Sequence, residues 1–283
     1  MKIPKRIEPL VAAGLVDTVI RQLLSGKEAM VYVVRCGEDT RCAKVYKEAD
    51  LRSFRQSVDY TEGRKVKNSR RARAMEKGTK YGRKAREEAW QSAEVDALYR
   101  LAAAGVRVPK PYNFIDGVLL MELVTDSDGN AAPRLADLTL TQAQSREYHQ
   151  VLIRQVVRML CAGVVHGDLS EYNVLVDSHG PVIIDLPQAV NAAGNNHAGN
   201  LLERDVDNLA TYFGRYAPEI LHTKYGKEIW ALYQSGKLTP HIELTGRFRP
   251  SDKPVDVDSV MREVDDVLKE EAARQRYKLE MGQ

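Results

Sequence analysis

The stretch Val164-Val-His-Gly-Asp-Leu-Ser-Glu-Tyr-Asn-Val-Leu-Val176 decides how this chain is interpreted. It places an acid, Asp168, five residues ahead of an amide, Asn173, and a second carboxylate ends the apolar run Val182-Ile-Ile-Asp185. Phosphoryl transfer needs oxygen ligands for Mg²⁺ beside a group that orients the attacking hydroxyl. The pattern therefore predicts phosphoryl-transfer chemistry, with Asp168 as the base and with Asn173 and Asp185 as metal ligands.

The alternative for His166-Gly-Asp168 is an ordinary turn with a capping aspartate. The separations from Asp168 to Asn173 and Asp185 argue against it, because they would bring two metal-ligand candidates beside one potential base. We expect His166 to be structural, with its ring hydrogen-bonded to backbone near the metal-binding loop.

The composition describes a globular chain of 283 residues, 43% of them hydrophobic, which suffices for one large core or two lobes that share a cleft. The net charge of +3 is too small to indicate nucleic-acid binding by the molecule as a whole. Three cysteines without CxxC spacing (Cys36, Cys42 and Cys161) support neither a disulfide framework nor a zinc site. We therefore expect a reducing cytoplasm.

No apolar run approaches the roughly 18 residues of a membrane span. The start, Met1-Lys-Ile-Pro-Lys-Arg6, lacks the apolar stretch that follows the basic region of a signal peptide. We expect neither a membrane contact nor export.

The hydrophobic pattern predicts a strand-rich first lobe and a helix-rich second lobe. The predicted strands are Thr18–Leu24, Met30–Arg35, Arg41–Tyr46, Tyr112–Ile115 and Val118–Met121, with one helix over 82–104 that stops at Gly105. A polar, turn-rich segment at 125–130 predicts a hinge, and a long helix follows over Thr141–Ala162, where Gln155 is the polar exception among apolar positions. The predicted fold class is α+β, with an N-terminal lobe over 1–121, a hinge over 122–130 and a C-terminal catalytic lobe over 131–283.

The first predicted hairpin carries the small-residue segment Ser25-Gly26-Lys27-Glu28-Ala29. Such residues let the backbone approach phosphate oxygens, and exposed amides there donate to them. An ordinary hairpin turn is an equal alternative for this segment alone.

Lys44 lies alone on one face of its strand, because its neighbours Ala43 and Val45 point to the other face. A lysine that faces a cleft can bind phosphates, and we pair it with Glu94 on the following helix. Glu87, Glu88 and Asp96 are competing partners, and a solvated helix residue is the alternative for Glu94.

These residues together resemble the RIO family of atypical serine/threonine protein kinases. The phosphate loop of that family, STGKEA, is similar to Leu24-Ser-Gly-Lys-Glu-Ala29, and its catalytic loop, HxDLSEYN, is similar to His166-Gly-Asp-Leu-Ser-Glu-Tyr-Asn173. Asp185-Leu-Pro-Gln188 also resembles the family, because no Phe-Gly follows the aspartate. The resemblance extends from Leu24 to about Phe213. About fifteen residues separate Asp185 from the next helix, which we expect to begin near Leu201.

The resemblance implies a bilobal kinase-like fold without a conventional activation segment, and ATP with Mg²⁺ (or Mn²⁺) as cofactors. It implies Asp168, Lys44 and Glu94 as catalytic residues and Asn173 and Asp185 as metal ligands. The adenine would lie against the hinge, with Met121 as gatekeeper and the backbone of Glu122, Leu123 and Val124 in contact with the base.

Some RIO members are ATPases that pass through an aspartyl phosphate, which here would form on Asp185. Asp205 would brace the catalytic loop by hydrogen bonds rather than touch substrate. Too little sequence precedes Val16 for the winged helix of some members, so the resemblance is to a bacterial-like member without that domain.

Eleven of the 23 residues from Arg64 to Arg86 are Lys or Arg, within a predicted flexible loop over about 55–82. A solvated loop is one interpretation, because like charges repel. The segment could instead contact RNA or a ribosome, or reach the nucleotide phosphates. Ser69 and Thr79 are candidate self-phosphorylation sites.

The leading hypothesis is an ATP- and Mg²⁺-dependent RIO-type serine/threonine protein kinase that phosphorylates itself, acts on an unidentified protein and hydrolyses ATP. A kinase-fold phosphotransferase for a small-molecule hydroxyl is the second hypothesis. The third is a nucleotide-switched RNA- or ribosome-associated binding protein.

Overall fold

The computed structural model describes residues 3–26, 28–47 and 93–249. By its contacts the chain divides into a unit of residues 1–247 and a unit of residues 248–283, and all features below lie in the first. The predicted loop over 55–82, the helix prediction for 82–92 and Lys27 lie outside the described residues. The lobe boundaries at 121 and 130 stay predictions.

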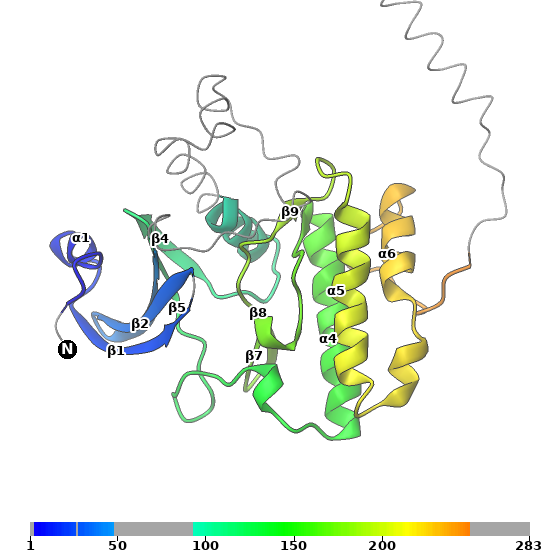
Figure 1. The fold of residues 1–283 in the computed structure, drawn as a ribbon, viewed down its shortest axis with the longest axis horizontal. Helices are drawn as coiled ribbons and strands as arrows, with labels where there is room; N and C mark the ends of the chain where they lie inside the picture. The colour runs from blue at the N-terminus through cyan, green and yellow to red at the C-terminus, as the bar shows by residue number, and fades with distance from the viewer. Residues whose placement is uncertain (1–2, 27, 48–92, 250–283) are drawn as a thin grey trace, which may run out of the picture. The chain divides into compact units, whose positions relative to one another are not determined.

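Five antiparallel strands form one sheet in the order β1-β2-β3-β5-β4 (Figure 1). The strands are β1 (Thr18–Ser25), β2 (Ala29–Cys36), β3 (Asp39–Tyr46), β4 (Pro111–Ile115) and β5 (Val118–Glu122). Each predicted strand is therefore confirmed, with ends that extend by one or two residues. Hydrogen bonding to the neighbouring strand, which the side-chain pattern does not encode, sets these ends.

Strand β3 divides its side chains between two faces of the sheet. Ala43 and Val45 join a cluster on one face with Ile7 and Leu10, which come from the N-terminal segment around the short helix α1 (Glu8–Ala12). Lys44 and Tyr46 alternate with them and lie on the other face, as the pattern of the strand predicts.

That other face is covered by a helix over residues 93–103. Val95, Leu98 and Leu101 are buried there, at spacings that repeat along one side of a helix. Gly105 ends the helix in a left-handed conformation, φ 70°, which confirms the predicted stop.

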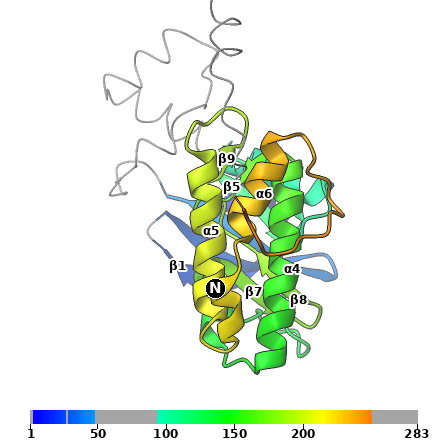
Figure 2. The same cartoon turned by 90° about the vertical axis from the view of Figure 1, so that its right-hand side faces the viewer.

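The C-terminal half is built on three helices that lie side by side, α4 (Gln142–Cys161), α5 (Ala198–Phe213) and α6 (Tyr225–Gln234) (Figure 2). Thr141 caps α4 through a reciprocal pair of hydrogen bonds with Gln144, so the helix begins and ends where the sequence predicts. Helix α5 begins at Ala198, three residues before the predicted Leu201.

Short elements precede and connect these helices, and those between α4 and α5 carry the polar motif. They are η3 (Leu135–Asp137), β6 (Val164–Val165), η4 (Glu171–Asn173), β7 (Val174–Asp177), β8 (Gly180–Ile183), β9 (Val190–Asn191) and η5 (Pro218–His222). Strands β7 and β8 form a hairpin, and β6 pairs with β9. The motif therefore lies on loops that are fixed at both ends by strand pairing.

A β-rich N-terminal part followed by a helical C-terminal part confirms the α+β, kinase-like fold class. Residues 186–197 alone connect Asp185 to α5, so the described chain has no room there for a conventional activation segment. None of the helices in the described ranges is long and apolar enough to cross a membrane.

Candidate active site

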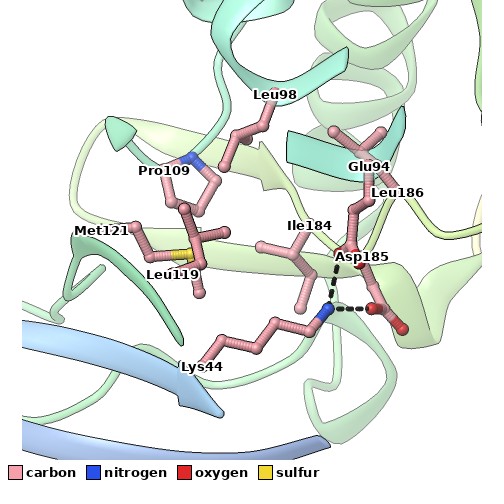
Figure 3. Close-up of a pocket in the computed structure, with 9 residues that line it drawn as sticks. All are labelled: Lys44, Glu94, Leu98, Pro109, Leu119, Met121, Ile184, Asp185 and Leu186. Carbon is pink, nitrogen blue, oxygen red and sulfur yellow. Dashed lines mark hydrogen bonds and ion pairs between the residues drawn. The ribbon is translucent and has the colours of Figure 1, made fainter. Parts of the chain in front are cut away.

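Lys44 connects the sheet to Asp185, one of the two predicted metal ligands. Its Nζ lies 2.6 Å from Glu94 Oε1 and 2.8 Å from Asp185 Oδ1, and the close-up shows the ammonium group pointing between the two carboxylates (Figure 3). Lys44 and Glu94 are buried, whereas 45% of the Asp185 side chain is exposed. Glu94 is the partner that the sequence predicted for Lys44. Of the competing residues, Asp96 is exposed, and Glu87 and Glu88 lie outside the described residues.

The two carboxylates hold the lysine in its charged form. Burial alone would lower the pKa of Lys44, but Asp185 and Glu94 together raise that pKa well above its usual value. Lys44 in turn lowers the pKa of Asp185, against the opposing effect of burial. Lys44 and Asp185 are therefore both charged at neutral pH, and the formal charges of the three side chains sum to one negative charge.

Asp185 has an unusual backbone. Its φ of 64° lies in the left-handed region, which aspartate tolerates better than most residues. The preceding residue is anchored twice, since the Ile184 N–H donates to the Asn173 carbonyl (3.0 Å) and the Ile184 carbonyl accepts from His166 Nε2 (3.1 Å). This confirms the structural role predicted for His166.

The ring of His166 also holds the backbone of Asp168, two residues further along the chain. Its Nδ1 accepts from the Asp168 N–H at 3.3 Å, so the ring lies between two backbone groups, the Asp168 N–H and the Ile184 carbonyl. The ring therefore connects the backbone of Asp168 to the strand that ends at Asp185.

Asp205, on α5, braces the same loop from below. Its two carboxylate oxygens accept from the Gly167 N–H (2.7 Å) and the Leu169 N–H (2.9 Å), which confirms the predicted bracing role. Arg204 donates to the Gly167 carbonyl. Burial raises the pKa of Asp205 to about 6, although the two backbone hydrogen bonds act in the other direction.

Asp168 itself is exposed, yet its carboxyl is partly desolvated. This desolvation raises the pKa of Asp168, and Asp185 adds to the rise, whereas His166 and Arg204 oppose it. A carboxylate of raised pKa, on a loop held by Asp205, is suited to accept a proton from a hydroxyl.

Asn173 is oriented by the loop that it closes. Its Nδ2 donates to the Asp168 carbonyl at 2.7 Å, which leaves the amide oxygen for another partner. The described residues contain no group of three or more His, Cys, Asp or Glu side chains that could hold a metal ion. Mg²⁺ nevertheless fits Asn173 and Asp185, because it keeps several waters and shares phosphate oxygens with its nucleotide.

The predicted phosphate loop lies in the β1–β2 hairpin. The Gly26 N–H donates to the Ala29 carbonyl (2.9 Å), and the Lys47 N–H donates to the Glu28 carbonyl (2.9 Å). Ser25 ends β1. The backbone thus forms a closed turn. A closed turn fits both a phosphate-binding loop and an ordinary hairpin, so it does not decide between these two interpretations.

The predicted hinge residues differ in how their backbone is used. The Glu122 N–H donates to the Lys110 carbonyl (2.8 Å), and the Val124 carbonyl accepts from the Ala132 N–H (2.9 Å). These two groups are engaged within the chain, so an adenine contact would fall on other backbone atoms of the Glu122–Val124 segment, Leu123 included. Met121 lines the pocket beside Lys44, and its role as gatekeeper stays a prediction.

A small pocket adjoins Lys44. Apolar side chains surround the ion pair in Figure 3, and the lining residues that the sequence did not single out are Leu98, Pro109, Leu119, Ile184 and Leu186. Leu186 follows Asp185 directly and is buried. Its apolar side chain next to a polar motif could have indicated this.

Two further residues escaped the sequence interpretation. Gln155, noted only as a polar exception, accepts from the Arg107 N–H at 3.0 Å and so fixes the chain between the 93–103 helix and β4 to α4. Tyr46, two residues after Lys44 on the same face of β3, lies beside the ion pair. Strand alternation could have identified Tyr46, whereas the partner of Gln155 is a purely tertiary contact.

The comparison with protein-family models supports the same assignment. The family model of the RIO domain matches residues 30–225, a range that contains Lys44, Glu94, Asp168, Asn173 and Asp185. Among solved structures, the kinase PK-1 of Cydia pomonella granulovirus aligns with a TM-score of 0.41 and 17% identity, over 66% of this chain and 58% of that chain.

Named relatives come from archaea and eukaryotes. The RIO-type serine/threonine-protein kinase Rio1 of Haloferax volcanii is 37% identical over 210 residues, which cover 74% of this chain and 68% of that protein. Rio1 of Methanocaldococcus jannaschii is 32% identical over 192 residues, 68% of this chain and 61% of the relative. Serine/threonine-protein kinase RIO1 of Homo sapiens is 28% identical over 214 residues, 75% of this chain but 36% of the relative.

The chain thus spans about two thirds of its archaeal relatives and about a third of the human one. The family implies that such a site uses ATP and a divalent metal ion. With a family match over residues 30–225 and a 37% identical relative covered across 68% of its length, the chain belongs to the RIO family and is a serine/threonine kinase of the RIO type.

Proposed function

We propose that this chain transfers the γ-phosphoryl group of ATP to serine or threonine hydroxyls through the site formed by Lys44, Glu94, Asp168, Asn173 and Asp185. The observation that supports this most directly is Lys44, whose Nζ lies within 2.8 Å of carboxylates from two distant parts of the chain. A lysine oriented by a helix glutamate beside a metal-loop aspartate is the arrangement by which kinases hold phosphates.

Each side chain has a separate task in this proposal. Lys44 binds nucleotide phosphates while Glu94 keeps it oriented. Asp168 accepts or steers the hydroxyl proton, and its raised pKa suits that task. Asn173 and Asp185 would hold Mg²⁺, which when bound neutralises charge that develops on the phosphates. We propose Mg²⁺, or Mn²⁺, as the ion, because both accept hard oxygen ligands and keep waters at the remaining positions.

Nucleotide binding is assigned to the two β-lobe segments beside Lys44. The turn over Ser25–Ala29, including Lys27, is proposed to cover the phosphates, and the segment from Met121 to Val124 is proposed to contact the adenine. The closed turn made by Gly26 and Ala29 supports the first assignment, since it holds the backbone in one conformation. The place of Met121 in the pocket lining supports the second.

The test is incubation with Mg²⁺ and γ-labelled ATP, with Asp168→Ala and Asp185→Ala compared with Asp96→Ala, an exposed helix control. Acid-stable label that disappears in Asp168→Ala supports hydroxyl phosphorylation. Hydroxylamine-labile label that disappears in Asp185→Ala indicates an aspartyl phosphate and an ATPase instead. Full activity of Asp168→Ala would contradict the proposed mechanism, and ATP hydrolysis stimulated by small hydroxyl compounds would indicate a small-molecule acceptor.

We also propose that the basic segment from Arg64 to Arg86 contacts RNA or ribosomal RNA. The proposal rests on its 11 Lys and Arg residues among 23. Charge contacts with phosphates weaken steeply as salt rises. Fluorescence anisotropy with a labelled RNA oligonucleotide over a salt series tests this, and binding that is absent or independent of salt would count against it.

The cytoplasm is our proposal for the compartment. All three cysteines of the chain, Cys36, Cys42 and Cys161, are free thiols. Free thiols persist where glutathione and thioredoxin keep them reduced. Fractionation of cells that express a tagged chain would check the assignment.

A further inference from the structure

Lys47 follows strand β3, three residues beyond Lys44, and has no role in the proposed phosphoryl transfer. Its Nζ donates to the Gly26 carbonyl at 2.5 Å, and its backbone N–H donates to the Glu28 carbonyl at 2.9 Å. Gly26 and Glu28 both belong to the turn between β1 and β2. Lys47 therefore connects the end of β3 to this turn twice, once through its backbone and once through its side chain.

The two contacts differ in what they require of the residue. Ala29 and Tyr46 form the terminal residue pair of the β2–β3 ladder, so the backbone bond from Lys47 to Glu28 extends that ladder by one step. Any residue with a backbone N–H can make this bond. The contact with Gly26 requires a long side chain that ends in a donor, which lysine supplies.

Gly26 is held at both of its polar backbone groups. Its N–H donates to the Ala29 carbonyl at 2.9 Å, and its carbonyl accepts from the Lys47 ammonium group. A free carbonyl in a phosphate-binding turn can rotate toward the phosphates, and its partial negative charge then repels them. The Lys47 ammonium group removes that freedom and offsets the charge of the carbonyl oxygen.

The charge of Lys47 is not neutralised by a carboxylate. Within the described ranges no ion pair joins Lys47 to an acidic side chain, whereas the Lys44 ammonium group contacts two carboxylates. The neutral Gly26 carbonyl uses one of the three N–H donors of Lys47. Lys47 therefore brings to the turn a positive charge that attracts a polyphosphate, in addition to the hydrogen bond that fixes the turn.

We propose that Lys47 is a positioning residue of the nucleotide site, whose ammonium group holds the turn closed by Gly26 and Ala29 in the form that binds the phosphates of ATP. This inference rests on the proposed function, because it deepens the assignment of that turn to phosphate binding. Lys47 acts through the Gly26 carbonyl and through its charge, rather than through the transferred phosphoryl group.

Equilibrium binding of ATP with Mg²⁺ and of adenosine, measured by competition against a fluorescent ATP analogue, tests this role. Lys47→Met keeps the length of the side chain and should raise the Kd for ATP about tenfold, as expected when one hydrogen bond from a charged group is lost. The Kd for adenosine should change less than about twofold, because adenosine has no phosphate for the turn to bind. An unchanged Kd for ATP, or an equal loss of affinity for both ligands, would overturn the proposal.

Lys47→Arg and Lys237→Met are the controls. Arginine keeps a charged donor at the end of a long side chain, so Lys47→Arg should bind ATP within about threefold of the wild type. Lys237 is an exposed lysine beyond α6, and its replacement removes the same charge without touching the turn. ATP affinity that falls in Lys47→Arg as far as in Lys47→Met, or that falls equally in Lys237→Met, would refute the assignment.

Phosphoryl-transfer kinetics separate this inference from the proposed function. A residue that positions the phosphate turn should raise KM for ATP about tenfold in Lys47→Met and lower kcat by less than about threefold. If Lys47→Met weakens ATP binding in a chain that transfers no phosphate, Lys47 stays assigned and the proposed function is contradicted. Phosphoryl transfer by Lys47→Met with an unchanged KM for ATP would overturn the role of Lys47 and leave the proposed function intact.

Discussion

Replacing Lys44 by methionine should destabilise the fold as well as abolish activity, and the two losses can be separated. Lys44 is 9% exposed and is shared by Glu94, 5% exposed, and by Asp185. Methionine fills a similar volume without a charge. The substitution therefore leaves Glu94 as a buried carboxylate with no cation beside it.

The size of the loss follows from the geometry. At 2.6 Å and an effective dielectric constant of about 20, the Lys44–Glu94 attraction is about 6 kcal/mol before the desolvation of both groups is subtracted. Breaking a buried pair by removing one partner typically costs about 3–5 kcal/mol. Asp185 adds little to this figure because 45% of its side chain is exposed and water screens its charge.

Urea unfolding followed by circular dichroism measures the free energy of unfolding. We expect Lys44→Met to lose about 3–5 kcal/mol and Lys44→Met/Glu94→Leu to recover most of it, because the double variant removes the uncompensated charge. Neither variant should transfer phosphate. A Lys44→Met chain as stable as the wild type, or a double variant no more stable than the single one, would refute the reasoning.

Three further changes test other parts of the fold. Burial lowers the pKa of His149 from 6.5 to about 4, so the unfolded chain alone takes up this proton as pH falls from 6.5 toward 4, and up to about 3 kcal/mol of stability is lost in that window. His149→Leu should remove that part of the pH dependence in urea unfolding, whereas a change at the exposed His179 should not. Asp205→Asn offers one acceptor oxygen to two backbone N–H donors, so we expect a loss of about 2 kcal/mol and a lower kcat at unchanged ATP affinity, and normal kcat would contradict the bracing role. Gly199→Ala places a Cβ 2.7 Å from the Trp230 ring and should lower stability by about 1–3 kcal/mol. An unchanged melting temperature would show that α5 and α6 can move apart without loss of stability.

The fold was predictable where one element determines its own shape. Helix α4 carries an N-terminal capping box at Thr141 and apolar positions at helical spacing, and both ends were found. The start of α5 was missed by three residues because Gly199 has a low helix propensity and interrupts the helical pattern there. The place of Gly199 is set by Trp230 of α6, which packs against it and leaves no room for a larger side chain.

The site was predictable where a motif keeps its residues close in sequence. Asp168 and Asn173 share one loop, and Asn173 closes it by donating to the Asp168 carbonyl. Lys44 and Glu94 were paired correctly, although the structure brings them together across 50 positions of sequence and Glu87, Glu88 and Asp96 were competing partners on the same segment. Gln155 could not be assigned in this way, since its partner is a backbone N–H that only tertiary packing supplies.

The charges of the site explain why nucleotide and cation depend on each other in this fold. Lys44, Glu94 and Asp185 together carry one excess negative charge, and Lys44 is already hydrogen-bonded to both carboxylates. A polyphosphate that approaches this site alone meets a net repulsion and a lysine that is engaged. The exposed side chain of Asp185 is the part of this network that a divalent cation can reach without disturbing the buried Lys44–Glu94 pair. The geometry therefore favours entry of ATP together with its metal ion, and Glu94 keeps Lys44 in place while Asp185 changes partner.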